Sequence, residues 1–316
     1  MAAKVWGMDL SDDELAEIDE FSLLEIYATR EGIAWSGQPR VRRVSFDGSS
    51  CDVVSAVVWG EDDPEIVLLH GAGQNAHTWD SLALALNRPL VAIDLPGHGR
   101  SSWRSDRDYS PWANARELAP VIEQLAPRAR AVIGMSLGAL SSMALAGLVP
   151  QLVKRLVLVD ATPAMGGRRR QLTEQELETV ALIGKTPTFS TFKEMLDATA
   201  AAAPGRSLDS LIPGVLHNST RLADGSWRWR YDRIFDPSVP RRAMSDLWDD
   251  LLGLSCPVML VRGGRSAFVS AEDVEEFARR VPDARVEVVP DAGHSVQSSH
   301  PILLASLIDD FVSDSL

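Results

Sequence analysis

The chain has 316 residues, of which 45% are apolar and 24% charged, and its formal net charge at pH 7 is −13. This length and apolar content predict a globular protein with a substantial core, and the negative charge argues against nucleic acid as a partner. No segment approaches the roughly 18 apolar residues of a membrane span, and the N-terminus lacks the apolar stretch of a signal peptide. We therefore expect a cytoplasmic protein.

The first predicted element is an acidic amphipathic helix at residues 11–30. Ser11 and Glu14 have the spacing of a capping box, and apolar residues recur at roughly helical spacing from Leu15 to Tyr27. Such a helix can cover a sheet edge, form a homodimer contact or gate a pocket. Packing against the core is favoured, because apolar stripes usually face a core.

From residue 41 the pattern changes to short β-rich runs that alternate with helical stretches. This alternation predicts a doubly wound α/β fold with a mostly parallel sheet of eight strands, and the continuous apolar runs fit strands that are buried on both faces. The predicted strands lie at 41–46, 52–59, 65–70, 89–95, 130–135, 154–160, 257–263 and 285–290, and the predicted helices at 78–86, 111–125, 137–148, 271–280 and 301–312.

The alternation stops between about residues 162 and 244, which we interpret as a lid inserted over the C-terminal edge of the sheet. The predicted organisation is thus an N-terminal helical extension (1–40), an α/β core (41–161 and 245–316) and the lid (162–244). Within the lid we expect a basic turn at 168–170, helices near 173–184 and 189–203, and a hairpin that turns at Asp224 and Gly225.

The strongest local motif is the stretch "VIGMSLGAL". A predicted strand runs into Gly134-Met135-Ser136-Leu137-Gly138 and then a helix, which is the context of a G-x-S-x-G nucleophile elbow. Presenting a serine oxygen at the tip of so sharp a turn forces strained dihedral angles and a close approach of strand and helix. Side chains at positions 134 and 138 would collide, which explains the glycines.

Four motifs, taken in their order along the chain, resemble those of a known protein family. The segments "VLLHGAGQN" (67–75), "VAIDLPGHGRS" (91–101), the elbow and "PDAGHSVQ" (290–297) follow one another as in the α/β-hydrolase family, which the chain resembles from about residue 41 to its end. The resemblance implies a serine nucleophile at Ser136, with its neighbour Leu137 and Ala72 of "HGAG" offering backbone N–H groups to an oxyanion.

A serine hydroxyl needs a positioned base, and His294 is the predicted one. It follows the last predicted strand on a glycine-containing loop, where α/β sheets collect their chemistry. His70 and His98 belong to turns of the family's motifs, so structural roles are favoured. The remaining histidines have no motif around them and are expected to pack or to lie on the surface.

The acid that should orient this base is missing from its usual place. In most proteins that the chain resembles, an Asp stands near position 267, which is Ala here. Glu272 and Asp273 open a predicted helix, where acids favour the helix dipole. Asp291 lies three residues before His294, and shaping the loop is as good an interpretation of it as orienting the base.

Asp160 is the favoured acid. It ends the apolar strand "RLVLV" at the sheet edge of Ser136, in the chain order nucleophile, acid, base. The chain here resembles some bacterial esterases of the superfamily, whose acid ends the strand after the elbow while a "GG-x-S" turn places a serine at the vacated site. That resemblance makes Ser266 a fourth, supporting member. Simple turn-forming roles remain open for both residues.

Trp227 and Trp229 alternate with Arg228 and Arg230 at the period of a strand, so both tryptophans should share one face. Packing on the body of the protein is favoured over a role in substrate binding. The only cysteines, Cys51 and Cys256, lack any metal or redox spacing and are expected to be buried free thiols.

These features together predict a serine hydrolase that acts on a small-molecule carboxylic ester or lactone and needs no metal or cofactor. Hydrolysis of a carbon–carbon bond in a diketone is an alternative, because similar folds use the same triad for it. Ser295 weighs against it, since those enzymes often carry Trp there. A non-catalytic ligand-binding homologue is the rival from another class.

Overall fold

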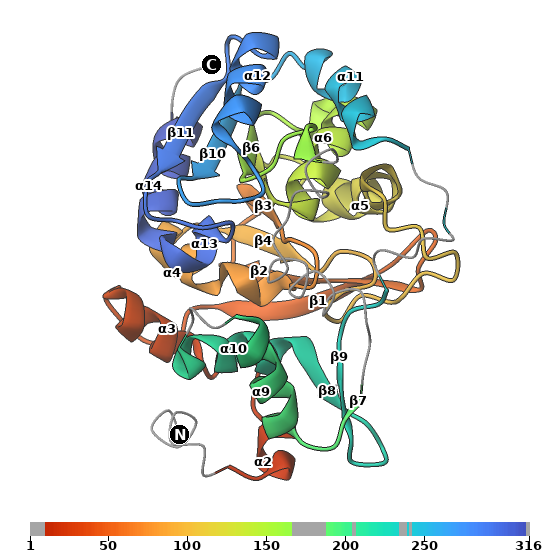
Figure 1. Ribbon diagram of the computed structural model, residues 1–316, viewed down its shortest axis with the longest axis vertical. Helices are drawn as coiled ribbons and strands as arrows, with labels where there is room; N and C mark the ends of the chain where they lie inside the picture. Colours follow the sequence, from red (N-terminus) through yellow and green to blue (C-terminus); the bar gives the residue numbers. More distant parts are fainter. Residues whose placement is uncertain (1–9, 166–187, 204–206, 234–238, 240–241, 314–316) are drawn as a thin grey trace.

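A computed structural model describes residues 10–165, 188–203, 207–233, 239 and 242–313 of the chain, and Figure 1 shows its central sheet. The sheet has eight strands in the order β1-β2-β4-β3-β5-β6-β10-β11. Strand β2 is antiparallel to both neighbours, and the other pairs are parallel. The predicted fold and all eight predicted strands are confirmed. The strands are β1 (Val41–Asp47), β2 (Val53–Trp59), β3 (Ile66–Leu69), β4 (Leu90–Ile93), β5 (Ala131–Met135), β6 (Leu156–Val159), β10 (Val258–Gly263) and β11 (Arg285–Val289).

The middle of the sheet is its most deeply buried part, because strands β3 to β6 are apolar on both faces and every residue in them is buried. Strand β5 lies between β3 and β6, with Leu69 beside Gly134 and Met135 beside Val159. The carboxyl ends of the three strands therefore meet at one edge. The residues that follow them, at positions 70, 136 and 160, are brought to that edge by register alone.

Helices cover both faces of the sheet (Figure 1). Helices α4 (Asp80–Leu86) and α14 (Pro301–Ser313) pack together on one face, and α5 (Pro111–Leu125), α6 (Leu137–Leu148) and α11 (Leu247–Leu252) on the other. The expected helix at 78–86 begins as a 3₁₀ turn, η1 (Ala76–Trp79), and α11 was not predicted. The other elements of the core are α12 (Ala271–Arg280), α13 (Val296–Ser299), η2 (Pro150–Leu152) and η4 (Met244–Asp246).

The N-terminal extension differs from the single helix that its periodicity predicts. Its described residues, from 10 onward, form two short helices, α2 (Asp12–Ala16) and α3 (Leu24–Glu31). The predicted capping box of Ser11 and Glu14 is present at the start of α2. The break follows from Asp19, whose carboxylate accepts a hydrogen bond from the Phe21 N–H at 3.0 Å and so favours a turn over a helix.

The segment between residues 162 and 244 contains a small three-stranded sheet in the order β7-β9-β8. The hairpin predicted at Asp224 and Gly225 joins β8 to β9, and Gly225 has a φ of 87°. Helix α10 was not predicted, and the expectations for 168–170 and 173–184 lie outside the described residues. The elements among the described residues of this segment are β7 (Thr188–Phe189), α9 (Phe192–Ala202), α10 (Leu208–Asn218), β8 (Ser219–Arg221) and β9 (Trp227–Trp229).

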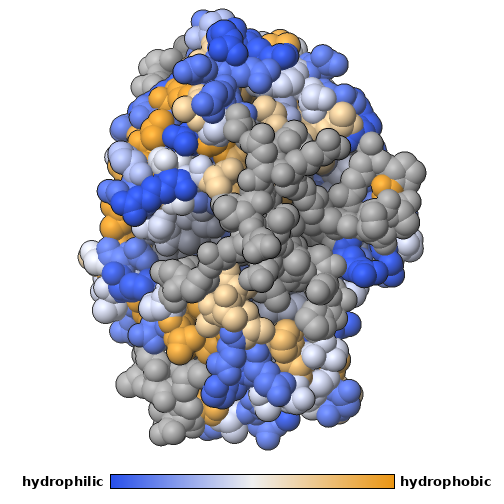
Figure 2. Space-filling view, viewed as in Figure 1, coloured by the Kyte–Doolittle hydropathy of each residue, from blue (hydrophilic) through white to orange (hydrophobic). Residues whose placement is uncertain are grey.

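In the face drawn in Figure 2, apolar residues form small, separate patches. Within the described part of the chain, no helix combines the length and the apolarity that crossing a bilayer requires. Cys51 is a buried free thiol, as expected, whereas Cys256 is free but only partly buried.

A cluster of partly buried charges connects the N-terminal extension to the core. The Glu20 carboxylate accepts hydrogen bonds from Arg43 at 2.8 Å and lies 3.0 Å from Arg100 and 3.4 Å from His77. Arg43, on β1, also donates to Asp94 at 2.7 Å. Burial raises the pKa of Glu20, but the contacts with His77 and Arg43 outweigh it and lower the pKa to about 2.

We predict that Glu20→Gln lowers the free energy of unfolding at pH 7 by about 2 kcal/mol, because the charge partners of Glu20 lose a partly buried carboxylate. A carboxylate with a lowered pKa stabilises the fold above its ordinary pKa of 4.5, and this contribution is lost as the pH falls toward 2. Urea denaturation at several pH values between 7 and 3 should therefore show the two proteins converging in acid. Glu25→Gln, at an exposed position on α3, is the control. An equal difference at every pH would contradict the prediction.

Candidate active site

Ser136 stands at the turn between β5 and α6. Its φ of 51° and ψ of −115° are unusual for a residue with a side chain and mark a strained turn. A Cβ atom at Gly134 would lie 2.4 Å from the Gly138 backbone, and one at Gly138 would lie 2.1 Å from the carbonyl oxygen of Leu69. Only glycine at both positions allows the strand to reverse so tightly into the helix, as the sequence motif predicts.

Asp160 and His294 form a close pair at the same edge of the sheet. Asp160 directly follows β6 and is fully buried, and His294 lies on the loop after β11. His294 Nδ1 is 2.6 Å from Asp160 Oδ2, and the Gly263 N–H donates to Asp160 Oδ1 at 2.9 Å. A buried carboxylate with such partners can hold a neutral imidazole in one orientation and stabilise its protonated form.

Ser266 is the third partner of this carboxylate, because its hydroxyl donates to Asp160 Oδ2. The Ser266 oxygen in turn accepts from the Phe268 N–H at 3.1 Å, which fixes the turn after β10. The Phe268 ring stacks on the His294 ring, with centroids 4.0 Å apart and planes 20° apart. The sequence offered no signal for the role of Phe268, since no motif includes it.

The rival acids have other partners. Asp273 belongs to the capping box of α12 with Ser270, and Glu272 stands in the first turn of the same helix. Asp291 is exposed and pairs with Arg265. Among the carboxylates of the described residues, the one that hydrogen-bonds His294 is that of Asp160.

The loop after β3 lies against the elbow. A Cβ atom at Gly71 would lie 3.3 Å from the Cβ of Ser136 and 2.6 Å from the sulfur of Met135. Ala72 follows in this loop, and Leu137 is the first residue of α6, where backbone N–H groups have no partner within the helix. The fold therefore places the loop that carries Ala72 against the elbow that carries Leu137.

His70 and His98 have contacts that fit the structural roles expected of them. Both are fully buried; His70 Nε2 accepts from the Leu95 N–H at 2.9 Å, and His98 Nδ1 lies 3.0 Å from the Pro96 carbonyl oxygen. Burial lowers the pKa of His98 to about 3. A neutral, fully buried imidazole of this kind holds a turn in place and is not accessible as a base.

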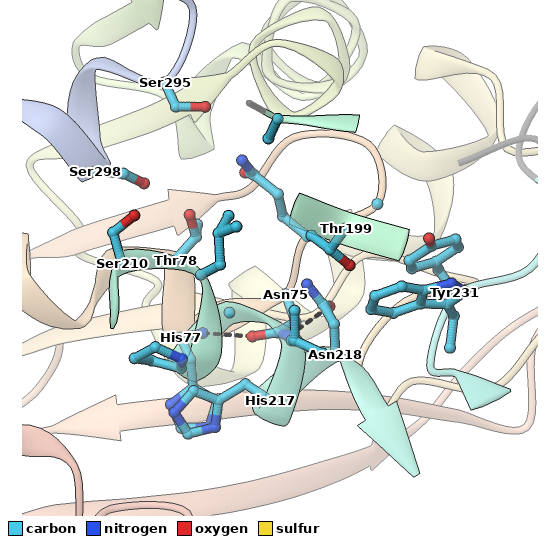
Figure 3. Close-up of a pocket in the computed structure, with 18 of the residues that line it drawn as sticks. Asn75, His77, Thr78, Thr199, Ser210, His217, Asn218, Tyr231, Ser295 and Ser298 are labelled. Carbon is cyan, nitrogen blue, oxygen red and sulfur yellow. Dashed lines mark hydrogen bonds between the residues drawn. The ribbon is translucent and has the colours of Figure 1, made fainter. Parts of the chain in front are cut away.

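A cavity of about 420 Å³ opens beside the Ala72 loop (Figure 3). Trp229 and Tyr231 line it, and so do Tyr27 and Arg30 of the N-terminal extension, for which packing was the favoured role and gating of a pocket an alternative. Both predicted lid tryptophans are buried. Trp227, however, packs on Phe192 with ring centroids 5.3 Å apart and does not line this cavity.

One group in the described residues has the composition of a metal site: His77, Asp80 and His217 place ligand atoms within 4.8 Å of one another. His77 Nδ1 lies 2.9 Å from Asp80, and the two imidazole rings stack 3.9 Å apart. Burial lowers the pKa of His77, but Asp80 and Glu20 outweigh it and raise the pKa to about 9. The positive charge of His77 and that of Arg43, whose Nη2 lies 3.1 Å from His77 Nε2, already balance the carboxylates of Asp80 and Glu20. The cluster therefore disfavours a metal cation.

Comparison with known proteins agrees with this geometry. A sequence model of the alpha/beta hydrolase family matches residues 66–307. The chain belongs to this family. The match spans the elbow, the Asp160 strand and the His294 loop.

Two proteins of known name illustrate what this chain is similar to. Esterase Rv0045c of Mycobacterium tuberculosis is 47% identical over 303 residues, which are 95% of this chain and 97% of the relative. Its crystal structure superposes with a TM-score of 0.83 at 44% identity, covering 94% of this chain and 99% of that one. The 2-(acetamidomethylene)succinate hydrolase of Mesorhizobium japonicum is 28% identical over 259 residues, 79% of this chain and 88% of the relative.

We predict that Gly138→Ala destabilises the protein by about 3 kcal/mol or more, because the added methyl group would overlap the Leu69 carbonyl oxygen between β3 and α6. Thermal and urea unfolding measure the change. Gly214→Ala is the matched control, since a Cβ atom there meets nothing within 4 Å and alanine favours the helix by up to about 1 kcal/mol. Equal stability of the two variants would show that the elbow tolerates a side chain.

Proposed function

We propose that the protein is a serine hydrolase that cleaves a carboxylic ester or lactone through an acyl-enzyme on Ser136. The 2.6 Å contact between His294 and Asp160, on the sheet edge that carries Ser136, is the main support for this proposal. The similarity to a relative named as an esterase supports the ester bond as the target.

In the proposed mechanism His294 Nε2 takes the proton of the Ser136 hydroxyl as its oxygen attacks the ester carbonyl. The backbone N–H groups of Ala72 and Leu137 stabilise the oxyanion that forms. Collapse of this intermediate expels the alcohol, which takes the proton from His294, and leaves an acyl group on Ser136. Water, deprotonated by His294, then attacks the acyl group and releases the acid.

Asp160 is the proposed acid of this triad, in place of the acid that relatives of the family carry near position 267. It holds the N–H of His294 Nδ1 and stabilises the imidazolium that forms in each step. Ser266 is a positioning residue, because its hydroxyl and the Gly263 N–H together fix the two carboxylate oxygens. The Phe268 ring limits rotation of the imidazole from its other side.

Residues 162–244 are the proposed lid. Helices α9 and α10 and the aromatic pair Trp229 and Tyr231, all from this segment, form part of the cavity wall beside Ala72. A substrate in this cavity would therefore contact the lid and the core at once. This arrangement assigns a binding role to Trp229 and a packing role to Trp227.

We predict that Ser136→Ala abolishes hydrolysis of 4-nitrophenyl acetate above the background rate, because no other group would form the acyl-enzyme. The wild type should also be labelled by a fluorophosphonate, whereas Ser136→Ala should not. Full activity in Ser136→Ala would refute the proposed nucleophile. A wild type that neither hydrolyses esters nor takes the label would favour a non-catalytic ligand-binding protein.

Asp160→Asn should lower kcat for the same ester by about 10⁴-fold, because an amide favours the wrong tautomer of His294. Asp291→Asn is the matched control: this second aspartate lies near His294 in sequence but is exposed, so its activity should stay within about twofold. The measurement is the steady-state rate of ester hydrolysis by each variant, compared with that of the wild type. Near wild-type turnover in Asp160→Asn would mean that the histidine works without this acid.

A further inference from the structure

The cavity beside Ala72 is large enough to bind a small molecule. Its volume of about 420 Å³ lies within the range of small-molecule pockets. Its wall includes Ala72, at the proposed oxyanion site, and Ser295, the residue after His294. Ser136 and His294 are not among the residues that line the cavity, which adjoins the proposed catalytic residues through Ala72 and Ser295.

One end of the cavity is rich in hydroxyl groups. Figure 3 shows Thr78, Ser210, Ser295 and Ser298 gathered on one side, and Ser81 also lines the cavity. These residues come from η1, α4, α10, α13 and the residue that precedes α13, so the tertiary fold assembles them. The opposite side carries Tyr231, whose ring stacks on Trp229 with centroids 5.5 Å apart. The cavity therefore has a hydroxyl-lined end and an aromatic end.

Several of these hydroxyl groups have hydrogen-bonding capacity that the protein does not use. Across the described residues, the side-chain oxygens of Ser81, Ser295 and Ser298 have no hydrogen-bond partner. Thr78 accepts a hydrogen bond from Gln297 at 3.2 Å, which leaves its own O–H free to donate. A hydroxyl group both donates and accepts, so this end suits a ligand oxygen that can do either.

The described wall carries no unbalanced charge. Its two cations are Arg30, which pairs with Glu31 at 2.8 Å, and the protonated His77, which pairs with Asp80. The other polar groups that line the cavity are neutral hydroxyls, amides and an imidazole, His217, whose pKa is lowered by burial. A carboxylate brought into this cavity would lose its water without gaining a free positive partner.

We propose that this cavity selects esters whose acyl or alcohol part is uncharged and oxygenated, with the substrate oxygen bound by Ser81 and Ser298. The inference rests on the proposed function, because it assigns the cavity to the substrate of Ser136. Ser81 and Ser298 are specificity-determining residues of that reaction. The aromatic end contacts the apolar part of the same group.

The test compares matched pairs of esters that differ in one hydroxyl group. The acyl pair is 4-nitrophenyl 3-hydroxybutyrate and 4-nitrophenyl butyrate, and the alcohol pair is 3-hydroxybutyl acetate and butyl acetate, followed by acid release. For each pair, the ratio of kcat/KM is measured in the wild type, Ser81→Ala and Ser298→Ala. Comparing ratios between proteins cancels the intrinsic reactivity of each ester.

We expect the ratio to favour the hydroxylated ester in one of the two pairs and to fall about three- to tenfold in each variant, as loss of one neutral hydrogen bond implies. Which pair responds identifies the half of the ester in the cavity. Ser299→Ala is the matched control, because Ser299 is the exposed neighbour of Ser298 on the same helix, and its ratios should match the wild type. The monoanionic 4-nitrophenyl hydrogen succinate should be a poorer substrate than the butyrate.

Two kinds of failure are distinguishable. Ratios unchanged by both variants in both pairs, or a preference for the succinate, would overturn the cavity assignment while Ser136-dependent hydrolysis of the butyrate leaves the proposed function standing. Absence of any Ser136-dependent hydrolysis would overturn both.

Discussion

The buried carboxylate of Asp160 is the contact on which the proposed chemistry depends. One oxygen accepts from the Gly263 backbone, and the other faces His294 and the Ser266 hydroxyl. The carboxylate thereby joins three separate segments: the end of β6, the turn after β10 and the loop after β11. Because Asp160 is fully buried, removing any of these partners would leave a polar group without compensation. The site is therefore held by the same contact that holds the three segments together.

Close backbone packing supplies the second constraint. The elbow exists because β5 can pass within contact distance of α6 and of the loop after β3, which the glycines at 71, 134 and 138 permit. The strained backbone at Ser136 is maintained by this packing and by the buried strands on either side. Local strain at the nucleophile is thus stabilised by the core of the whole sheet.

The N-terminal extension and the proposed lid both contribute residues to the wall of the cavity beside Ala72. The charge cluster of Glu20, Arg43 and Asp94 holds the extension against β1, and the next helix, α3, places Tyr27 and Arg30 at the cavity. Asp12 of α2 accepts a hydrogen bond from Trp227 at 3.0 Å, which links the extension to β9. The extension therefore contributes to the shape of the binding space as well as to stability.

The sequence by itself determined the sheet, its eight strands and the elbow, because apolar runs and glycine spacing report local requirements that few other arrangements satisfy. It also indicated Asp160, since the carboxyl ends of neighbouring parallel strands must share an edge. The tertiary structure alone decided the rest. Phe268 beside His294, Tyr27 and Arg30 at the cavity and its row of hydroxyl groups come from segments distant in sequence. Their proximity depends on how helices and loops pack, which no local periodicity encodes.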